Sequence, residues 1–113
     1  MTRDEAIREV VRRLVDYYQP EKIYLIGSSA RGEARPDSDL DFIVVIEDDP
    51  PKWKLPGGGV RKHLRGIPFD IDVVPFTRRD FEHRSDWLMS LPAIALREGL
   101  LEYDDAETAR RSQ

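Results

Sequence analysis

Residues 27–41 constrain this chain more than any other stretch, because they join two apolar segments through a short turn. The apolar segments, residues 23–26 and 42–46, have the length and composition of buried strands. Between them lie a glycine-and-serine turn, Gly27-Ser28, then a polar loop and two acids separated by one residue, Asp39 and Asp41. This order predicts one strand over 22–26 that leads into the turn and a second strand over 40–46 with the two acids at its start.

A helix is predicted to precede the first strand. Thr2 and Glu5 have the spacing of a capping box, in which each side chain accepts from a free amide of the first turn. The apolar residues that follow recur at helical spacing and form one stripe, as expected for a helix docked on a core. They are Ile7, Val10, Val11, Leu14, Val15 and Tyr18.

The second half of the chain is predicted to continue with shorter elements. We expect a helical turn within 30–33, a mobile glycine connector at 56–59, a short basic helix over 60–65 and a third strand over 69–74. Thr77 and Ser90 are placed to cap two further helices, and Gly99 to end the second as a left-handed cap. Residues 100–103 have the pattern of an edge strand, and the polar tail 104–113 is expected to fray.

Composition excludes several classes of protein. With 113 residues the chain has room for one domain, and its net charge of −4 argues against non-specific nucleic-acid binding. The chain has no cysteine and two histidines, so a disulfide framework or a zinc site built on thiolates or imidazoles is not expected. Neither a membrane-spanning apolar run nor a secretory signal is present, and we expect a soluble, cytoplasmic protein.

The pair Asp39 and Asp41 is the strongest chemical signal. Side chains two apart on a strand point to the same side, and two like charges there are costly unless a cation neutralises them. Carboxylates without nearby His or Cys suit magnesium or manganese. The third strand supplies Asp70 and Asp72, again two apart, and either one would complete a three-carboxylate site. Such a site can hold two metal ions about 3.5–4 Å apart for an in-line phosphoryl displacement.

The turn before these acids is suited to a phosphate group. Gly27 lets the backbone approach a ligand closely, and Ser28 offers an amide and a hydroxyl to phosphate oxygens. Arg31 is the nearest basic residue and is a candidate to offset triphosphate charge, although a loop arginine is as often simply solvated. An isolated Asp-x-Asp commonly marks a loop or a cap, but here it opens an apolar strand after a Gly-Ser turn, which favours a functional site.

Gly27-Ser28, followed after ten residues by Asp39-Leu40-Asp41, resembles the signature of the DNA polymerase beta-like nucleotidyltransferase superfamily. The short chain and the wording Gly-Ser-x-Ala-Arg-Gly-Glu-Ala over 27–34 resemble its minimal nucleotidyltransferases, the MNT proteins, which are often paired with HEPN proteins as antitoxin and toxin. Residues 72–77 and 96–103 are also similar to that group. The resemblance covers roughly residues 23–103.

The resemblance implies an α+β fold, a minimal polymerase beta-like domain with a small mixed sheet packed with helices. It implies a single domain over 1–103, followed by the polar tail 104–113. Asp39 and Asp41 would ligate magnesium, and Gly27 and Ser28 would hold the nucleoside triphosphate. Asp72 is preferred as the third carboxylate because the segment after it follows the family's register, with Asp70 as its rival. Asp72 would also assist deprotonation of the acceptor hydroxyl.

The leading hypothesis is a magnesium-dependent transferase that moves AMP from ATP onto a hydroxyl of a HEPN-type toxin protein. The alternative from another class is an antitoxin or complex subunit that acts by binding and at most holds a nucleotide. An exposed apolar patch would favour it, with Trp53, Trp87 and Leu88 as candidates. A third hypothesis is transfer to a small molecule such as an aminoglycoside, with a second subunit completing the pocket. A homo- or hetero-oligomer is compatible with all three.

Overall fold

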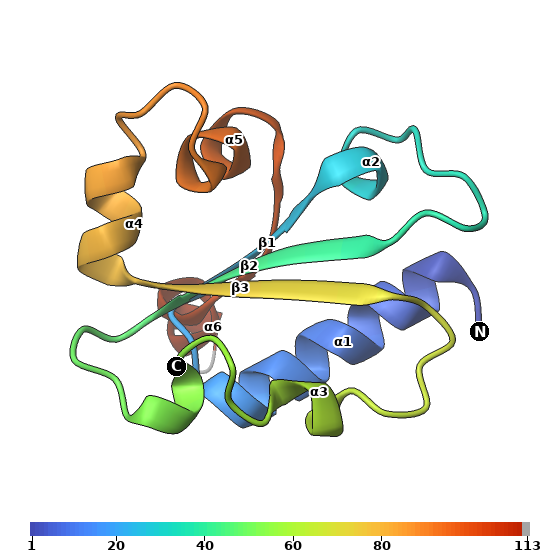
Figure 1. Ribbon diagram of the computed structural model, residues 1–113, viewed down its shortest axis with the longest axis horizontal. Helices are drawn as coiled ribbons and strands as arrows, with labels where there is room; N and C mark the ends of the chain where they lie inside the picture. Colours follow the sequence, from blue (N-terminus) through green and yellow to red (C-terminus); the bar gives the residue numbers. More distant parts are fainter. Residues whose placement is uncertain (112–113) are drawn as a thin grey trace.

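A four-stranded mixed sheet forms the centre of the structure, a computed structural model that describes residues 1–111 (Figure 1). The strand order is β3-β2-β1-β4. β1 (Lys22–Ile26) pairs antiparallel with β2 (Leu40–Ile46) and with β4 (Leu100–Asp104), whereas β2 pairs parallel with β3 (Ile71–Thr77). The predicted α+β fold with a small mixed sheet is confirmed, and β1 and β2 have the bounds that the apolar runs suggested.

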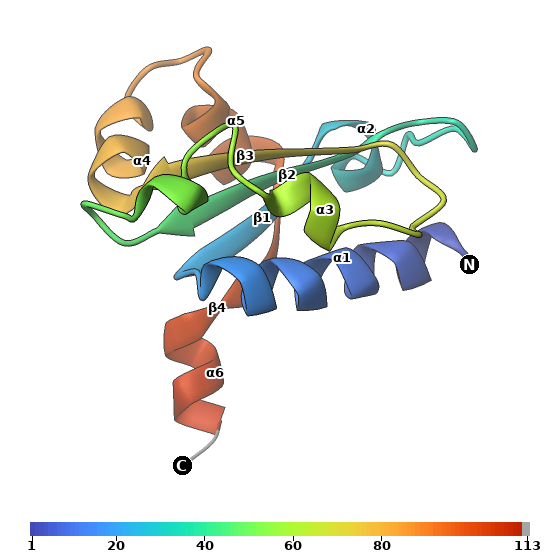
Figure 2. The same ribbon diagram turned by 60° about the horizontal axis from the view of Figure 1, so that its bottom comes forward.

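Helices cover both faces of this sheet. α1 (Arg3–Tyr18) and α3 (Val60–His63) lie on one face, and α4 (Arg78–Arg84) and α5 (Leu91–Glu98) lie on the other (Figures 1 and 2). Three further helical segments connect or follow the strands: α2 (Gly27–Ala30), the 3-10 turn η1 (Lys52–Lys54) and α6 (Asp105–Arg111). The sheet is therefore buried on two sides, which accounts for the nearly continuous apolar run in β2.

β2 supplies side chains to two apolar clusters. Phe42 and Val44 are buried in the cluster that includes the apolar stripe of α1. Ile43 and Val45 are buried in a smaller cluster with residues from α4 and α5. Because successive side chains of a strand alternate between faces, Asp41 shares the α4 and α5 side with Ile43 and Val45. The acid thus opens a strand whose following residues are fixed by packing on both sides.

The start of α1 has the predicted capping box. The Thr2 hydroxyl accepts from the Glu5 amide at 3.1 Å, and the Glu5 carboxylate accepts from the Thr2 amide at 2.8 Å. At the other end the helix stops after Tyr18, where Gln19 adopts a left-handed conformation with φ of 45°. Local sequence signals therefore set the N-terminal end of α1 correctly.

Burial of Tyr18 leads to a prediction for alkaline pH. The side chain is 1% exposed, and desolvation raises its pKa to about 12 from an ordinary value of 10. The unfolded chain loses the phenolic proton first, so the free energy of unfolding should fall by roughly 1–3 kcal/mol as the pH rises from 10 to 12. Urea unfolding across this range, with tyrosinate absorbance as a second readout, measures the loss. Tyr18→Phe should reduce this loss, and an equal loss in that variant would contradict the assignment.

Three predicted elements have different bounds in the structure. The third strand begins at Ile71 rather than residue 69 and continues through Pro75 to Thr77. Proline is tolerated here because β3 is an edge strand, so one of its sides has no ladder to complete. The helical turn expected within 30–33 lies earlier, at Gly27–Ala30, directly after β1. The short basic helix is shorter than expected and ends at His63.

Gly99 ends α5 as predicted, but its backbone conformation differs from the predicted one. Its φ of −74° is not left-handed, so the prediction of a left-handed cap is wrong. A Cβ at this position would lie 2.5 Å from the carbonyl oxygen of Ala95. The glycine is therefore needed for the close approach of the chain to the end of α5. Thr77 and Ser90 cap their helices as predicted, accepting from the amides of Asp80 and Ala93.

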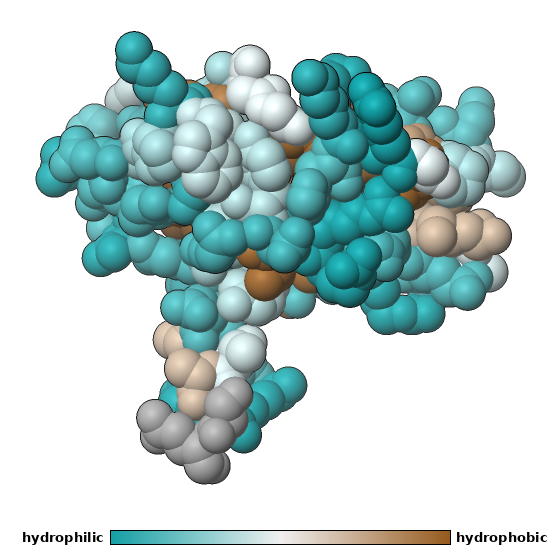
Figure 3. Space-filling view, turned by 90° about the horizontal axis from the view of Figure 1, so that it is seen from below, coloured by the Kyte–Doolittle hydropathy of each residue, from teal (hydrophilic) through white to brown (hydrophobic). Residues whose placement is uncertain are grey.

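The C-terminal segment is helical where the sequence suggested a frayed tail. Residues 105–111 form α6, which projects from the sheet beyond β4 (Figure 2), while residues 112–113 lie outside the described part of the chain. The face that carries α1 is mostly hydrophilic (Figure 3). Across residues 1–111, none of the helices combines the length and the apolar character needed to cross a membrane.

Candidate functional site

The turn after β1 lies against Asp41, the acid within β2. Ile26 pairs with Asp41 in the antiparallel register, so Gly27 emerges beside that carboxylate. Gly27 has a φ of +77°, and a Cβ added to it would lie 2.7 Å from Oδ2 of Asp41. Glycine is therefore required here for two reasons, the left-handed backbone and the close approach of the acid.

β3 brings a second acid to the same place. In the parallel register Asp72 is the partner of Asp41, so the two side chains share one side of the sheet. Burial raises the pKa of Asp41, and the charges of Asp72 and Asp39, together with a hydrogen bond to Asp72, raise it further. The half-buried Asp41 carboxyl group is thus under the influence of the other two predicted acids, Asp39 and Asp72.

This donor set fits a divalent cation by its chemistry. Three carboxylates offer only hard oxygen ligands, and their mutual repulsion favours a bound positive charge. Within residues 1–111, no three acidic, His or Cys side chains are already gathered closely enough to hold an ion. Asp39 and Asp72 are exposed, however, and exposed side chains change rotamer in picoseconds to nanoseconds. The positions of these two carboxylates are therefore free to adjust when an ion binds.

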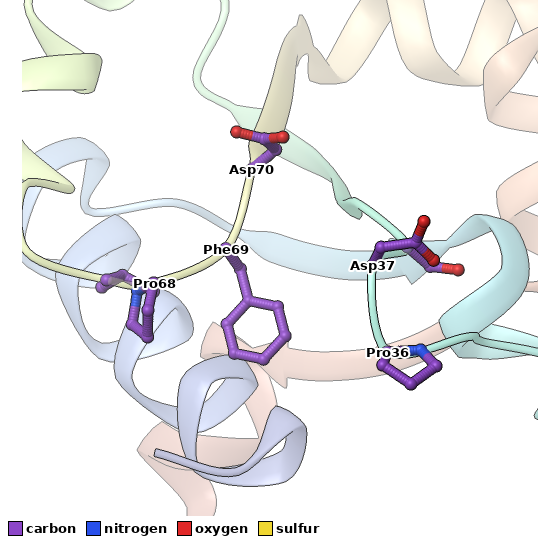
Figure 4. Close-up of a pocket in the computed structure, with 7 residues that line it drawn as sticks. Pro36, Asp37, Pro68, Phe69 and Asp70 are labelled. Atoms are coloured by element: carbon purple, nitrogen blue, oxygen red, sulfur yellow. The ribbon is translucent and has the colours of Figure 1, made fainter.

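Asp70, the rival for the third carboxylate, lies apart from this group. It precedes β3, and its carbonyl oxygen accepts from the Leu40 amide at 2.9 Å. Its side chain lines a separate pocket with Asp37, Pro68 and Phe69 (Figure 4). It is not among the charges that raise the pKa of Asp41. The structure therefore brings Asp72, rather than Asp70, to the acids of β2.

The remaining predicted site residues lie in and after α2. Ser28 is half-buried, and its carbonyl oxygen accepts from the Glu33 amide at 2.9 Å. The Arg31 guanidinium group forms ion pairs with Glu33 at 3.5 Å and with Glu98 at 3.7 Å. Arg31 thus lies beside the turn but is paired with acids of the chain itself. Nucleotide binding by Ser28 and Arg31 stays a prediction.

Sequence reasoning missed Arg3. The residue falls within the predicted capping box, and the sequence predicts no role for it, but its side chain reaches Ser29 of α2 and the loop before Asp39. One signal in the sequence was available. Arg3 is a cation in the first turn of a helix, where the helix dipole disfavours positive charge, so its position alone marked it as unusual.

Solved structures of other proteins share this fold. One solved structure is a Sulfolobus solfataricus protein described as a nucleotidyltransferase, with a TM-score of 0.57 and 17% identity over 91% of this chain and 81% of that chain. Another is a toxin–antitoxin structure with AMP-PNP, with a TM-score of 0.57 and 19% identity over 97% of this chain and 80% of that chain. At these identities the likeness shows the fold.

Sequence comparison defines the family more directly. No curated protein matches the sequence. The model of the nucleotidyltransferase domain, by contrast, matches residues 5–107, which include both strands with acids and the turn at Gly27. The superfamily resemblance of the sequence is confirmed by this match, and with it a transferase of the nucleotidyl type. The chain belongs to the nucleotidyltransferase domain family.

Proposed function

We propose that this chain is a magnesium-dependent transferase that moves AMP from ATP onto a hydroxyl group of a partner protein. We propose further that it is the antitoxin of a HEPN/MNT toxin–antitoxin pair. The observation that carries the proposal is the position of Asp41, which lies beside Gly27 and is the register partner of Asp72, with the charge of Asp39 also acting on it. A similar fold occurs in a toxin–antitoxin structure with AMP-PNP, which supports ATP as donor and a protein as partner.

The proposed reaction is an in-line displacement at phosphorus. The acceptor hydroxyl oxygen forms a bond to the α-phosphorus of ATP, the bond from that phosphorus to the oxygen of the β-phosphate breaks, and pyrophosphate leaves. Asp72 is assigned to receive the hydroxyl proton, since it is exposed at the edge of the acid group. Magnesium, or manganese in its place, would be held by Asp39, Asp41 and Asp72 and would neutralise charge on the phosphate oxygens.

The turn and Arg31 are assigned to the triphosphate. Gly27 leaves room for a phosphate next to the acids, and Ser28 offers its amide and hydroxyl. Arg31 would exchange its ion pairs with Glu33 and Glu98 for phosphate oxygens. Such exposed pairs are worth about 0–1 kcal/mol each, so the exchange costs little.

Intact mass measurement tests the proposal. The chain is incubated with the co-expressed product of the neighbouring gene, ATP and magnesium, and the partner should gain the mass of one or more AMP groups. Chelation of the divalent ion should prevent the gain, and CTP, GTP and UTP in parallel measure the preference for adenine. The modified residue is then located by peptide mass spectrometry, with tyrosine as the expected acceptor.

The double variant Asp39→Asn with Asp41→Asn is the matched control. It should leave the partner unmodified and the toxin active. The enzymatic proposal is wrong if the wild-type chain adds no mass and the double variant still neutralises the toxin. Neutralisation would then depend on contact alone.

A second candidate function, neutralisation by binding, is favoured by exposed apolar side chains. Trp87 is 48% exposed, and Leu88 and Met89 are 75% and 78% exposed, all in the connection between α4 and α5. This connection lies on the side of the sheet away from α1 (Figure 1). Exposed apolar groups that cluster on a surface commonly mark a protein interface. This candidate expects a stoichiometric complex whose stability is unchanged by the aspartate variants, measured by size-exclusion chromatography with light scattering.

A further inference from the structure

Arg3 connects the first turn of α1 with the turn that follows β1 and with the loop before β2. Its Nη1 donates to the hydroxyl oxygen of Ser29 at 3.1 Å and to the carbonyl oxygen of Ser38 at 3.0 Å. Its Nη2 donates to the carbonyl oxygens of Arg35 at 2.6 Å and Pro36 at 3.4 Å. One guanidinium group therefore binds two segments that are separate in the sequence.

The same side chain contacts a third segment. The guanidinium carbon of Arg3 lies 5.1 Å from the centroid of the Phe69 ring, a cation–π distance. Phe69 lies in the segment that leads into β3, and its ring points away from the Asp70 carboxylate (Figure 4). Phe69 also lines the pocket that Pro36 and Ser38 line from the other side. Arg3 thus contacts residues of both walls of this pocket.

Two of these segments adjoin residues of the candidate site. Ser29 follows the turn formed by Gly27 and Ser28. The loop that Arg3 binds is closed on itself, since the Ser38 amide donates to the Arg35 carbonyl oxygen at 3.0 Å and the Arg35 amide donates to the Ser38 hydroxyl at 2.9 Å. The residue after that loop is Asp39.

The contacts of Arg3 depend on the shape of its side chain. Its acceptors are a hydroxyl oxygen and backbone carbonyl oxygens. Among residues 1–111, Arg3 forms no ion pair with a carboxylate within 4.0 Å. The planar guanidinium group presents several N–H donors in fixed directions, whereas a lysine ammonium is a compact point charge. Lysine at this position would keep the charge but could not donate hydrogen bonds to both Ser29 and the 35–38 loop in the same geometry.

We propose that Arg3 is a positioning residue that fixes the phosphate-side turn and the Asp39 loop relative to each other. The consequence for nucleotide and metal binding rests on the proposed function, while the ordering of the loop does not. Without Arg3 the 35–38 loop keeps its internal bonds but loses its connection to α1 and α2. Asp39 and Ser28 would then sample positions in which they do not face the same ligand.

The experiment compares Arg3→Gln and Arg3→Lys with Arg8→Gln, which alters an exposed arginine further along α1. The first readout is hydrogen–deuterium exchange at residues 31–39. The second is the dissociation constant for a non-hydrolysable ATP analogue with manganese, measured by calorimetry well below the melting temperature. Both Arg3 variants should exchange faster in this loop and bind roughly 10- to 100-fold more weakly, the range seen when outer partners of metal ligands are removed. Arg8→Gln should match the wild type.

Three outcomes overturn the proposal. Unchanged exchange at 31–39 in Arg3→Gln would show that Arg3 does not order the loop. Faster exchange at 31–39 with unchanged affinity for the ATP analogue would show that Arg3 stabilises the loop but does not position the ligand-binding residues. Wild-type affinity in Arg3→Lys would show that charge alone is needed. If the wild-type chain binds the analogue but modifies no partner, the proposed transfer is wrong while the assignment of Arg3 still stands on both readouts.

Discussion

Replacing Asp41 with Asn is expected to lower nucleotide transfer by about a thousandfold and to raise the stability of the folded chain at neutral pH. Asp41 is the half-buried member of the acid group, so its loss removes the proposed metal ligand that is the most buried of the three. The same burial, with the charges of Asp72 and Asp39, raises the pKa of Asp41 and disfavours its ionised form. Asparagine has nearly the same shape and no charge to desolvate.

The gain in stability should depend on pH in a defined direction. The pKa of Asp41 is higher in the folded state than its ordinary value of 3.8, so the folded state binds this proton more tightly than the unfolded state. The stabilisation of the protonated form is complete below that ordinary value and is lost as the pH rises through the folded-state pKa. The difference between Asp41→Asn and the wild type should therefore be small in acid and grow toward neutral pH.

Urea unfolding at several pH values, without added divalent ions, measures this difference. Asp86→Asn serves as a control because it removes an exposed acid from the connection between α4 and α5. A less stable Asp41→Asn variant at neutral pH would contradict the expected repulsion within the acid group. Added manganese should reverse the order by stabilising the wild type alone, since a ligand that binds only the folded state raises its stability.

Replacing Gly27 with Ala is expected to cost both stability and activity. Alanine at a φ of +77° is strained by about 1–2 kcal/mol, and its Cβ would lie 2.7 Å from Oδ2 of Asp41. The carboxylate cannot stay where it is, so transfer should fall by about a hundredfold, the cost of a displacement near 1 Å at a reacting centre. Steady-state transfer assays and thermal unfolding measure the two effects.

Gly32 provides the matched control. It also has a left-handed backbone, with a φ of +72°, but a Cβ there would meet nothing within 4 Å. Gly32→Ala should therefore show the loss of stability without the loss of activity. Equal activity losses in the two variants would mean that the backbone strain, and not the contact with Asp41, decides the effect at Gly27.

The strands and the acids could be predicted from the sequence because their signals are local. The apolar run of β2 is buried on both faces, and the spacing of Asp39 and Asp41 fixes their common side. The sequence also predicted a carboxylate from the third strand, but the choice between Asp70 and Asp72 rested on resemblance. Only the parallel register, in which Asp72 faces Asp41, distinguishes them physically.

The features that could not be predicted depend on contacts between distant segments. The role of Arg3 arises from where α1 lies relative to the loop at 35–38, which no helical periodicity reveals. The strand β3 extends past Pro75 because it is at the edge of the sheet, and edge position is a property of the whole topology. The backbone conformation of Gly99 was predicted wrongly, because a glycine after a helix is expected in sequence whether it adopts a left-handed cap or only permits close approach to Ala95.

The parallel pairing of β2 with β3 also bears on how the protein is made. β1 and β2 are antiparallel neighbours joined by residues 27–39. β3 pairs with β2 only after the longer connection 47–70 has returned the chain to the same end of the sheet. Parallel pairing through a long connection is slow to form, because the chain entropy is lost before the contacts are gained. A newly synthesised chain would thus possess Asp39 and Asp41 well before Asp72 joins them. Competence for catalysis would then require this parallel pairing, and chains in which β3 has not joined the sheet would be inactive in nucleotide transfer.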